Sequence, residues 1–240
     1  MKIFAHRGAS ADAPENTMAA FRKACDMGAH GIELDVQMSA DGKLVVIHDH
    51  TLMRTSNGQG MVNDHTLAEL QQLDFGGWFS PAFQGERIAT LHEVLSFIAE
   101  TGMELNIELK TYPMEYDTRI PLCTVDMVQS FDLMDKVILS SFDHRSLMDA
   151  KRRDARIQTG LLYSANIINV GDYARKLGAQ FIHPHYAYID QTEIRNCMQN
   201  GISVNAWTVD EIAVAEKLRE MGVAALIADK PDIMIPVVCG

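Results

Sequence analysis

A unit that recurs along the chain constrains its fold more than any other feature. The unit is an amphipathic helix, then a glycine, then a short run rich in apolar and β-branched residues. Five glycines occupy this position: Gly28, Gly102, Gly178, Gly201 and Gly222. A left-handed glycine that ends a helix and leads at once into a strand is what a short helix-to-strand loop requires. The recurrence therefore predicts strands that alternate with helices.

The predicted elements follow from this rhythm and from hydrophobic periodicity. Strands are predicted at residues 2–6, 31–38, 44–48, 103–109, 137–141, 158–162, 181–184, 202–206 and 225–228. Helices are predicted at 17–27, 91–101, 121–131, 145–154, 170–177, 191–200 and 210–221, with a short one after Pro231. Thr90 with Glu93 forms a capping box, and Asn16 is the predicted N-cap of the first helix.

Alternating strands and helices favour a parallel sheet covered on both faces. About eight such units favour closure into a barrel, and the sequence lacks the glycine fingerprints of open nucleotide-binding sheets. We predict an α/β fold, a TIM (β/α)8 barrel, with residues 1–240 as a single domain. Residues from about 49 to 87 break the rhythm and predict a small inserted subdomain, whose core would be Trp78, Phe79 and Phe83.

The charge balance limits the partners of this chain. There are 21 Lys and Arg against 32 Asp and Glu, a net charge of −11, which argues against nucleic acid or an anionic membrane. No apolar run has the length of a membrane span, and a strand that begins at Lys2 leaves no room for a targeting segment. With four scattered cysteines, we expect a cytoplasmic protein without stable membrane association. The oligomeric state stays open.

Carboxylates stand on two of the predicted strands. Alternation places Glu33 and Asp35 on one face of the second strand. It also places Asn106, Glu108 and Lys110 on one face of a later strand. Because the carboxyl ends of barrel strands build the active site, we expect these polar faces to meet at the barrel mouth.

Glu33, Asp35 and Glu108 are the candidate metal ligands. Buried carboxylates need a cation or firm hydrogen bonds, and hard oxygen ligands suit Mg²⁺ or Ca²⁺ better than zinc. The alternative is a carboxylate cluster neutralised by Arg7 and Lys110 alone. Three acidic groups against two basic ones favour the metal.

Two histidines at predicted strand ends are candidates for proton transfer. They are His6 and His48, and imidazole titrates near neutral pH. A lone histidine at a strand end is more often structural, but two of them beside carboxylates and cations favour catalysis. The pairs His48/His50 and His183/His185 also match an H-x-H zinc pattern, which is weak because no helical histidine partner follows.

Arg7, Lys110 and Trp207 are the candidate substrate contacts. The two cations can serve as counterions of the carboxylates, clamp a phosphoryl oxygen, or do both. Trp207 either packs under the mouth or forms a wall for an apolar or glycerol-like group, and the sequence leaves these two roles open.

The motifs in chain order resemble those of the glycerophosphodiester phosphodiesterases. They are His6-Arg7-Gly8, Pro14-Glu15-Asn16-Thr17, Glu33-Leu34-Asp35-Val36, His48-Asp49 with Arg54-Thr55 and Gly58, Glu108-Leu109-Lys110, and Trp207-Thr208. The resemblance runs over almost the whole chain, and the joint occurrence of these motifs is highly specific. It implies a TIM barrel with a small insertion after His48. It also implies hydrolysis of glycerophosphodiesters to glycerol 3-phosphate and an alcohol, with a divalent cation.

The resemblance also implies roles for single residues. It makes His6 and His48 the acid–base pair, and it makes Arg7 and Lys110 phosphate contacts. Glu33, Asp35 and Glu108 would hold the metal. Two departures are small: Ser56 stands where a second Thr is usual, and Ala228-Asp229-Lys230 replaces a common Thr-Asp pair. We expect neither to touch the site. The chain looks like a cytoplasmic form, since periplasmic bacterial members carry a signal peptide.

The predicted chemistry is metal-assisted hydrolysis of a phosphodiester. One histidine removes a proton from the nucleophile and the other protonates the leaving alkoxide. We predict that His6 is the base and His48 the acid. The residues alone are equally compatible with His48 as the base and His6 as the acid. The nucleophile is either water or the substrate's own 2-hydroxyl, by way of a cyclic phosphate. Three alternatives remain: a lysophospholipase D, a zinc-dependent barrel amidohydrolase, and a non-catalytic binding protein.

Overall fold

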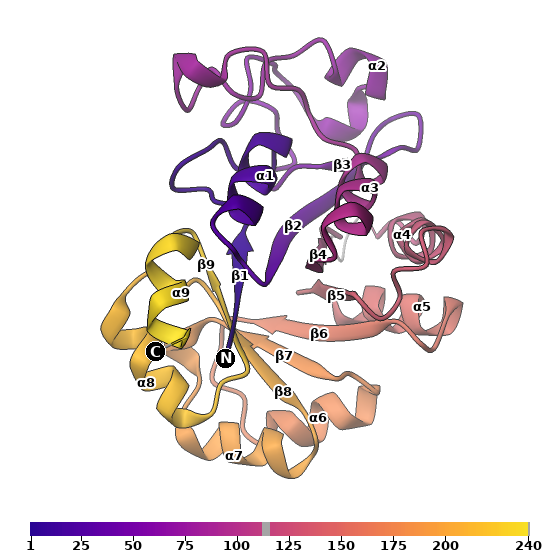
Figure 1. Cartoon of the computed structure of the whole chain (residues 1–240). Coiled ribbons are helices and arrows are strands. Elements are labelled where there is room, and N and C mark those ends of the chain that lie inside the picture. Colours follow the sequence, from indigo (N-terminus) through magenta and orange to yellow (C-terminus); the bar gives the residue numbers. More distant parts are fainter. Residues whose placement is uncertain (112–115, 240) are drawn as a thin grey trace.

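The computed structural model describes residues 1–111 and 116–239, and its strands form a barrel surrounded by helices (Figure 1). The strands are β1 Lys2–His6, β2 Gly31–Met38, β3 Leu44–Val46, β4 Glu104–Leu109, β5 Val137–Ser141, β6 Gln158–Tyr163, β7 Phe181–Pro184, β8 Ser203–Ala206 and β9 Ala225–Ala228. The helices are α1 Met18–Asp26, α2 Leu67–Leu70, α3 Leu91–Thr101, α4 Arg119–Ser130, α5 His144–Arg153, α6 Val170–Leu177, α7 Gln191–Gln199, α8 Ile212–Met221 and α9 Pro231–Cys239. The 3₁₀ turns of the described residues are η1 Val62–Asp64, η2 Pro81–Phe83 and η3 Tyr186–Tyr188.

The barrel closes through β1, which pairs in parallel with both β2 and β9. Around the ring the parallel order is β1, β2, β4, β5, β6, β7, β8 and β9. Helices pack on the outside, where the aliphatic faces of the strands bury most of the apolar core. The predicted TIM barrel is therefore confirmed, and the polar faces of its strands point inward.

Strand β3 differs from the prediction, because it does not belong to the ring. It pairs antiparallel with β2, with Val46 opposite Val36 and Leu44 opposite Met38. Only a tight turn joins the two strands, and its Gly42 has a φ of 77°. A parallel crossover needs a dozen or more residues. A connection as short as this one can therefore only form a hairpin. The hairpin turns the chain back and returns His48 to the barrel mouth.

Residues between β3 and α3 form a lobe at the top of Figure 1, above α1. The lobe has an apolar cluster of its own, which includes Leu52, Leu70 and Phe75. The predicted core residues do not belong to this cluster: Trp78 is 41% exposed. It contacts Phe79, which in turn contacts Phe83, edge to face. These rings pack on one another at the surface of the lobe, while Phe75 and aliphatic side chains fill its interior.

The helix ends follow the sequence signals with one exception. All five glycines after helices have a positive φ, between 70° and 93°. Thr90 and Glu93 make both hydrogen bonds of a capping box, as predicted. The N-cap of α1 is Thr17, however, and not Asn16. Asn16 is instead used in the site described below.

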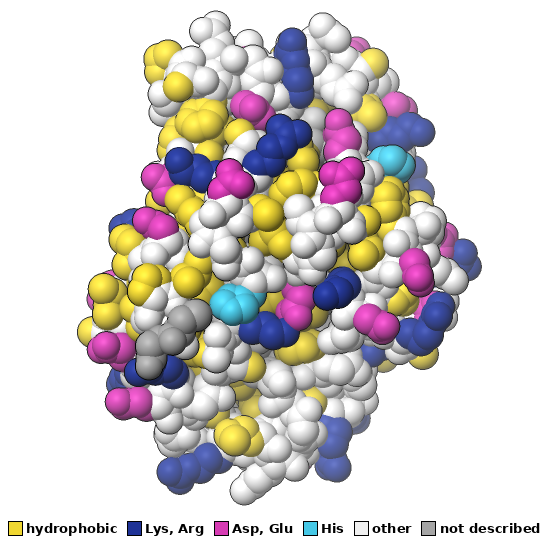
Figure 2. Space-filling view, viewed as in Figure 1, with side chains coloured by type: hydrophobic (Ala, Val, Ile, Leu, Met, Phe, Trp, Pro, Cys, Tyr) yellow, Lys and Arg dark blue, Asp and Glu magenta, His cyan; other side chains and the backbone are white. Residues whose placement is uncertain are grey.

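Two surface properties concern possible partners. Figure 2 shows basic and acidic side chains interspersed over one face of the molecule, although the chain as a whole carries a net charge of −11. Among the described residues, no helix combines the length and the apolar character that crossing a membrane demands.

Candidate active site

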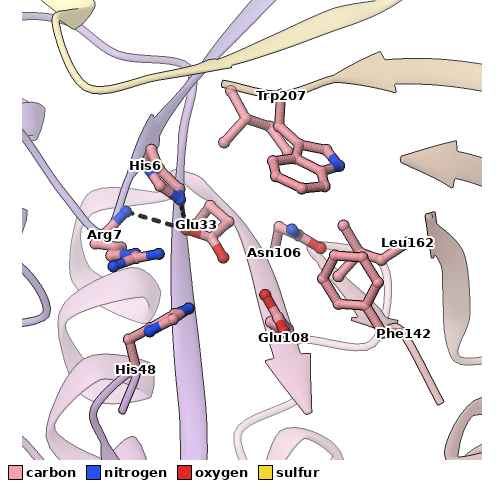
Figure 3. Close-up of a pocket in the computed structure, with 10 residues that line it drawn as sticks. His6, Arg7, Glu33, His48, Asn106, Glu108, Phe142, Leu162 and Trp207 are labelled. Atoms are coloured by element: carbon pink, nitrogen blue, oxygen red, sulfur yellow. Dashed lines mark hydrogen bonds and ion pairs between the residues drawn. The ribbon is translucent and has the colours of Figure 1, made fainter. Parts of the chain in front are cut away.

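A pocket of about 240 Å³ lies at the barrel mouth, where the carboxyl ends of the strands meet. Figure 3 shows two kinds of wall around it. The polar wall comprises His6, Arg7, Glu33, His48, Asn106 and Glu108. The apolar wall comprises Phe142, Leu162, Trp207 and Ile227. The structure thus brings together most of the site residues predicted from the sequence, and Asp35 and Lys110 adjoin them through the ion pairs described below.

The end of β1 has a backbone that fits a sharp turn. Arg7 and Gly8 both have a positive φ, 58° and 84°. A Cβ on Gly8 would lie 2.6 Å from the Cβ of Ala20 in α1. A glycine is therefore required next to the helix, and the turn presents His6 and Arg7 to the pocket.

The three predicted metal ligands lie together. Asp35 and Glu108 are register partners on the neighbouring strands β2 and β4, and Glu33 is the partner of Asn106. One carboxylate oxygen from each of Glu33, Asp35 and Glu108 lies within 4.8 Å of the others, and all three residues are buried. Alternation along two adjacent strands is enough to produce this cluster.

Two cations partly compensate the cluster. The Nε of Arg7 is 3.4 Å from Asp35, and its backbone N–H donates to Glu33 at 3.0 Å. Lys110 Nζ donates to Glu108 at 2.8 Å and lies 3.6 Å from Asp35. Both predicted cations therefore contact the carboxylates, as the counterion interpretation requires.

The compensation is incomplete, and the carboxyl pKa values reflect this. Burial, reinforced by the negative charge of Asp35, raises the pKa of both Glu33 and Glu108. Burial also acts on Asp35, but Lys110 and Arg7 outweigh it and lower its pKa. Two of the three carboxyl groups are thus driven toward the neutral form when Arg7 and Lys110 are the only cations. An additional positive charge would favour the ionised form of all three.

His6 is held by an aspartate from the far end of the chain. Its Nδ1 lies 2.6 Å from Asp229 Oδ1, which also accepts a hydrogen bond from Ser10 at 3.0 Å. Burial alone would lower the pKa of His6, but the hydrogen bond to Asp229 and the charge of Glu33 raise it. The expectation that the segment around Asp229 does not touch the site is therefore wrong.

His48 is held in the same way by its neighbour in sequence. Its Nδ1 lies 2.6 Å from Asp49 Oδ1. Burial lowers the pKa of His48, and the positive charges of Lys110 and Arg7 add to this effect against the charge of Asp35. Each candidate catalytic histidine therefore has a carboxylate at Nδ1, and the Nε2 of His6 lies 4.0 Å from a carboxylate oxygen of Glu33.

Arg54, at the start of the inserted segment, ties this arrangement together. Its guanidinium donates to both oxygens of Asp49, at 2.6 and 3.0 Å, and to both oxygens of Glu15, at 2.7 and 2.8 Å. Glu15 also accepts from Arg7 at 2.8 Å. One guanidinium thus fixes the carboxylate behind His48 and the carboxylate behind Arg7.

Sequence reasoning did not assign roles to these supporting residues. Asp49, Arg54 and Glu15 stand within the family's motifs, next to the candidate site residues. This position in the motifs is their one signal in the sequence. Asn16, predicted as a helix cap, donates from Nδ2 to Asp35 at 2.8 Å. Asp229 lies 223 positions from His6, and local periodicity carries no information at that distance.

Trp207 is held in place on the apolar wall. Its Nε1 donates to the carbonyl oxygen of His183 at 2.7 Å, and its ring meets Phe142 edge to face with centroids 5.7 Å apart. None of the H-x-H histidines belongs to the metal-type cluster found among the described residues, although His48 lines the same pocket. His183 is buried inside the barrel, where its Nε2 and the Nδ2 of Asn205 are 3.1 Å apart. Among the described residues, the metal-type cluster is that of the three carboxylates.

The fold and the site define a class of protein: a (β/α)8-barrel enzyme with two histidine–aspartate pairs and a carboxylate cluster at the carboxyl end of the barrel. Comparison with known proteins defines the family. Residues 6–233 match the model of the glycerophosphoryl diester phosphodiesterase family. The chain belongs to this family, and it is a phosphoric diester hydrolase.

Individual relatives agree with this assignment. A glycerophosphodiester phosphodiesterase from Caldanaerobacter subterraneus subsp. tengcongensis is 41% identical over 236 residues, which cover 98% of this chain and 97% of the relative. One from Bacillus subtilis is 35% identical, over 95% of this chain and 83% of the relative. A phosphodiesterase from Oleispira antarctica, solved with the product sn-glycerol 3-phosphate, superimposes with a TM-score of 0.94 at 32% identity, over 100% of this chain and 97% of that one.

Proposed function

We propose that this enzyme hydrolyses glycerophosphodiesters to glycerol 3-phosphate and an alcohol, with a divalent cation and two catalytic histidines. One observation carries the proposal: the histidines of two histidine–aspartate pairs line one small pocket together with two members of a buried cluster of three carboxylates. The bound glycerol 3-phosphate in the Oleispira antarctica relative supports the same product here.

Glu33, Asp35 and Glu108 would hold the cation, Mg²⁺ or Ca²⁺. The donor set fits, because all three ligands are hard oxygens that lie close together. Asp35 Oδ1 accepts no hydrogen bond from any described residue, so a lone pair remains for a cation. When bound, the cation supplies positive charge to a phosphate oxygen and lowers the pKa of a water molecule that it binds.

Arg7, Lys110 and Trp207 would position the substrate. The two cations already stand beside the carboxylates, and a phosphate oxygen in the pocket would meet their remaining N–H groups. Trp207, with its ring fixed by the bond to His183, would form the wall against the glycerol portion. The apolar carbons of glycerol suit such a wall, while its hydroxyls face the polar side.

His6 and His48 would move the protons. A carboxylate at each Nδ1 fixes the proton there, so that each Nε2 is available to the substrate. One imidazole accepts the proton of the nucleophile, which is water or the substrate's 2-hydroxyl. The other donates a proton to the leaving alkoxide. Each transfer typically contributes about 10²–10⁴-fold.

A comparison of leaving groups tests this proposal and assigns the two roles. His48→Ala should lower turnover of glycerophosphocholine by about 10²-fold or more, while calorimetry still detects metal binding. With the p-nitrophenyl ester of glycerol 3-phosphate, whose leaving group needs no proton, the loss should be much smaller if His48 is the acid. His6→Ala is the matched variant and should then lose activity on both substrates. A wild-type rate in His48→Ala would refute the mechanism, and the reverse pattern would make His6 the acid.

We also propose a cytoplasmic location and an organisation as one domain. Cys197 is a buried free thiol, which suits a reducing compartment. The lobe between β3 and α3 adjoins the site through Arg54, which favours an insertion in the barrel over an independent unit. We propose no nucleic-acid partner, since the net charge is −11.

A further inference from the structure

A buried amide on β2 bonds the segment that carries His48. Gln37 lies on the same face of β2 as Asp35, and it is 5% exposed. Its Nε2 donates to three consecutive carbonyl oxygens, those of Ile47 at 3.0 Å, His48 at 3.0 Å and Asp49 at 2.8 Å. A single side chain therefore holds the backbone of both members of a histidine–aspartate pair.

The segment needs such a donor because it has just left the sheet. Strand β3 ends at Val46, and the backbone bond beyond it runs from the N–H of Ile47 to the carbonyl oxygen of Asp35 at 3.0 Å. In the part of the chain that the structure describes, no backbone N–H donates to the carbonyl oxygens of residues 47–49. A buried carbonyl group without a partner is costly. Gln37 thus takes the place of the backbone partners that a strand would have given them.

Gln37 and Arg54 hold different parts of this segment. Arg54 bonds the carboxylate of Asp49, at 2.6 and 3.0 Å, and that carboxylate meets the Nδ1 of His48. Gln37 instead bonds the main chain from which both of these side chains start. Arg54 is partly exposed, whereas Gln37 is buried. The amide therefore ties the position of His48 to β2, the strand that carries two of the three clustered carboxylates.

We infer that Gln37 is a positioning residue, which sets the imidazole of His48 at the distance that proton transfer requires. The inference rests on the proposed function, in which His48 moves a proton. Gln37 is not part of the pocket lining, whereas His48 is, so the amide acts on the reaction through His48. A catalytic group that is misplaced by about 1 Å can cost about 10²-fold in rate. Without the amide, the main chain of residues 47–49 would shift toward other donors, and His48 would move with it.

Gln37→Met tests the inference, because methionine keeps the length of the side chain and removes the donor. The kcat for glycerophosphocholine should fall by about 10- to 100-fold, with KM changed by less than about twofold. Calorimetry should still detect metal binding. Thr124→Val is the matched control, since the buried hydroxyl of Thr124 donates to a carbonyl oxygen within α4, that of Ile120, at 2.7 Å. It should lower the thermal stability and keep the wild-type kcat.

A second background separates positioning from general damage to the fold. In His48→Ala there is no imidazole left to position, so the addition of Gln37→Met should lower kcat no further, within about twofold. On glycerophosphocholine and the p-nitrophenyl ester, Gln37→Met should also show the same relative losses as His48→Ala. Damage to the site as a whole would instead lower kcat equally in the wild-type and His48→Ala backgrounds, and this result would overturn the inference.

The remaining outcomes are also decisive. An unchanged kcat in Gln37→Met would show that His48 is positioned without the amide, and the inference would be wrong. If Gln37→Met does not fold, Gln37→Asn takes its place, because asparagine keeps an amide that is one methylene too short to reach the three carbonyls. The same loss and the same dependence on His48 are expected of it. A wild-type enzyme that does not hydrolyse glycerophosphocholine would instead refute the proposed function.

Discussion

The two halves of the barrel mouth are held in position by different means. On the polar half, from the ends of β1, β2 and β4 and the segment after β3, most side chains have two or more charged or hydrogen-bonded partners. Arg54 alone makes four hydrogen bonds to two carboxylates. On the apolar half, from β5 to β9, the rings pack edge to face, and within the described part of the chain Trp207 makes a single side-chain hydrogen bond.

The difference fits the roles that we propose for the two halves. Proton transfer and the binding of a phosphoryl group depend on donors and charges held within a few tenths of an ångström, so redundant hydrogen bonds are needed. Apolar contact is non-directional and roughly proportional to the area buried, so rings on loops are sufficient. Substitutions on the polar half should therefore act on kcat, and those on the apolar half on KM and substrate choice.

Removal of the carboxylate cluster should have the largest effect. Glu33→Gln and Glu108→Gln should each lower kcat by about 10²–10³-fold, because a charge at the reacting centre is lost. EDTA should abolish activity, and Mg²⁺ or Ca²⁺ should restore it. Glu104→Gln is the control on the same strand as Glu108, since the side chain of Glu104 forms an ion pair with Lys2 at the surface. Activity that survives both EDTA and the Glu33 substitution would remove the metal from the mechanism.

Asp229→Asn should come next, with a loss in kcat of about 10²-fold and a nearly unchanged KM. The amide keeps the shape of the side chain but removes the charge that fixes the Nδ1 proton of His6. Steady-state kinetics and a thermal melt separate this effect from unfolding. Asp232→Asn, on the exposed first turn of α9, should behave as wild type. Equal effects from the two substitutions would mean that Asp229 does not act through His6.

Arg54→Ala should lower kcat by about tenfold, because Asp49 and Glu15 would lose a shared partner. Arg54 is partly exposed, so added guanidinium can enter and should restore part of the rate. Arg54→Lys should not restore it, since an ammonium lacks the planar fork that makes paired hydrogen bonds to both Asp49 and Glu15. Arg22→Ala, an exposed arginine on α1, should show neither the loss nor the rescue. If added guanidinium does not restore activity to Arg54→Ala, the role of Arg54 is structural only.

The smallest effect concerns a histidine beneath the apolar half. His183 has no carboxylate partner among the described residues, and burial lowers its pKa to about 3. Because the pKa in the unfolded chain is about 6.5, the unfolded state binds the proton first as the pH falls. The stability that neutral His183 contributes is complete above the unfolded pKa of about 6.5 and is lost as the pH falls below it. The free energy of unfolding should decrease by roughly 0.7 kcal/mol between pH 7 and pH 6. Denaturant unfolding of His183→Gln should lack this slope, and a slope equal to that of wild type would assign it to other groups.

Much of the site could be predicted from local sequence alone. Alternation placed Glu33, Asp35 and Glu108 on inward faces, and β2 and β4 are neighbours in the closed barrel, so the three carboxylates meet. The barrel itself followed from the repeated helix, glycine and strand. These features depend on a period of two along a strand or on helix ends, and both are local properties.

The rest depended on contacts between distant segments. The hairpin of β2 and β3 was missed because its apolar pattern is also that of a barrel strand, and only the length of the turn distinguishes the two. The supporting carboxylates were missed for a related reason. Asp229 reaches His6 only once β9 closes the barrel against β1.

By itself, the sequence determined the class of fold, the family through its motifs, and which side chains face the mouth, because periodicity and motif chemistry are fixed by the order of residues. The tertiary structure alone decided what stands behind each catalytic candidate: Asp229 behind His6, and Arg54 between Asp49 and Glu15. It also separated a polar half from an apolar half. The physical reason is that barrel closure brings together strand ends and loops that are far apart along the chain, and local patterns do not encode which of them become neighbours.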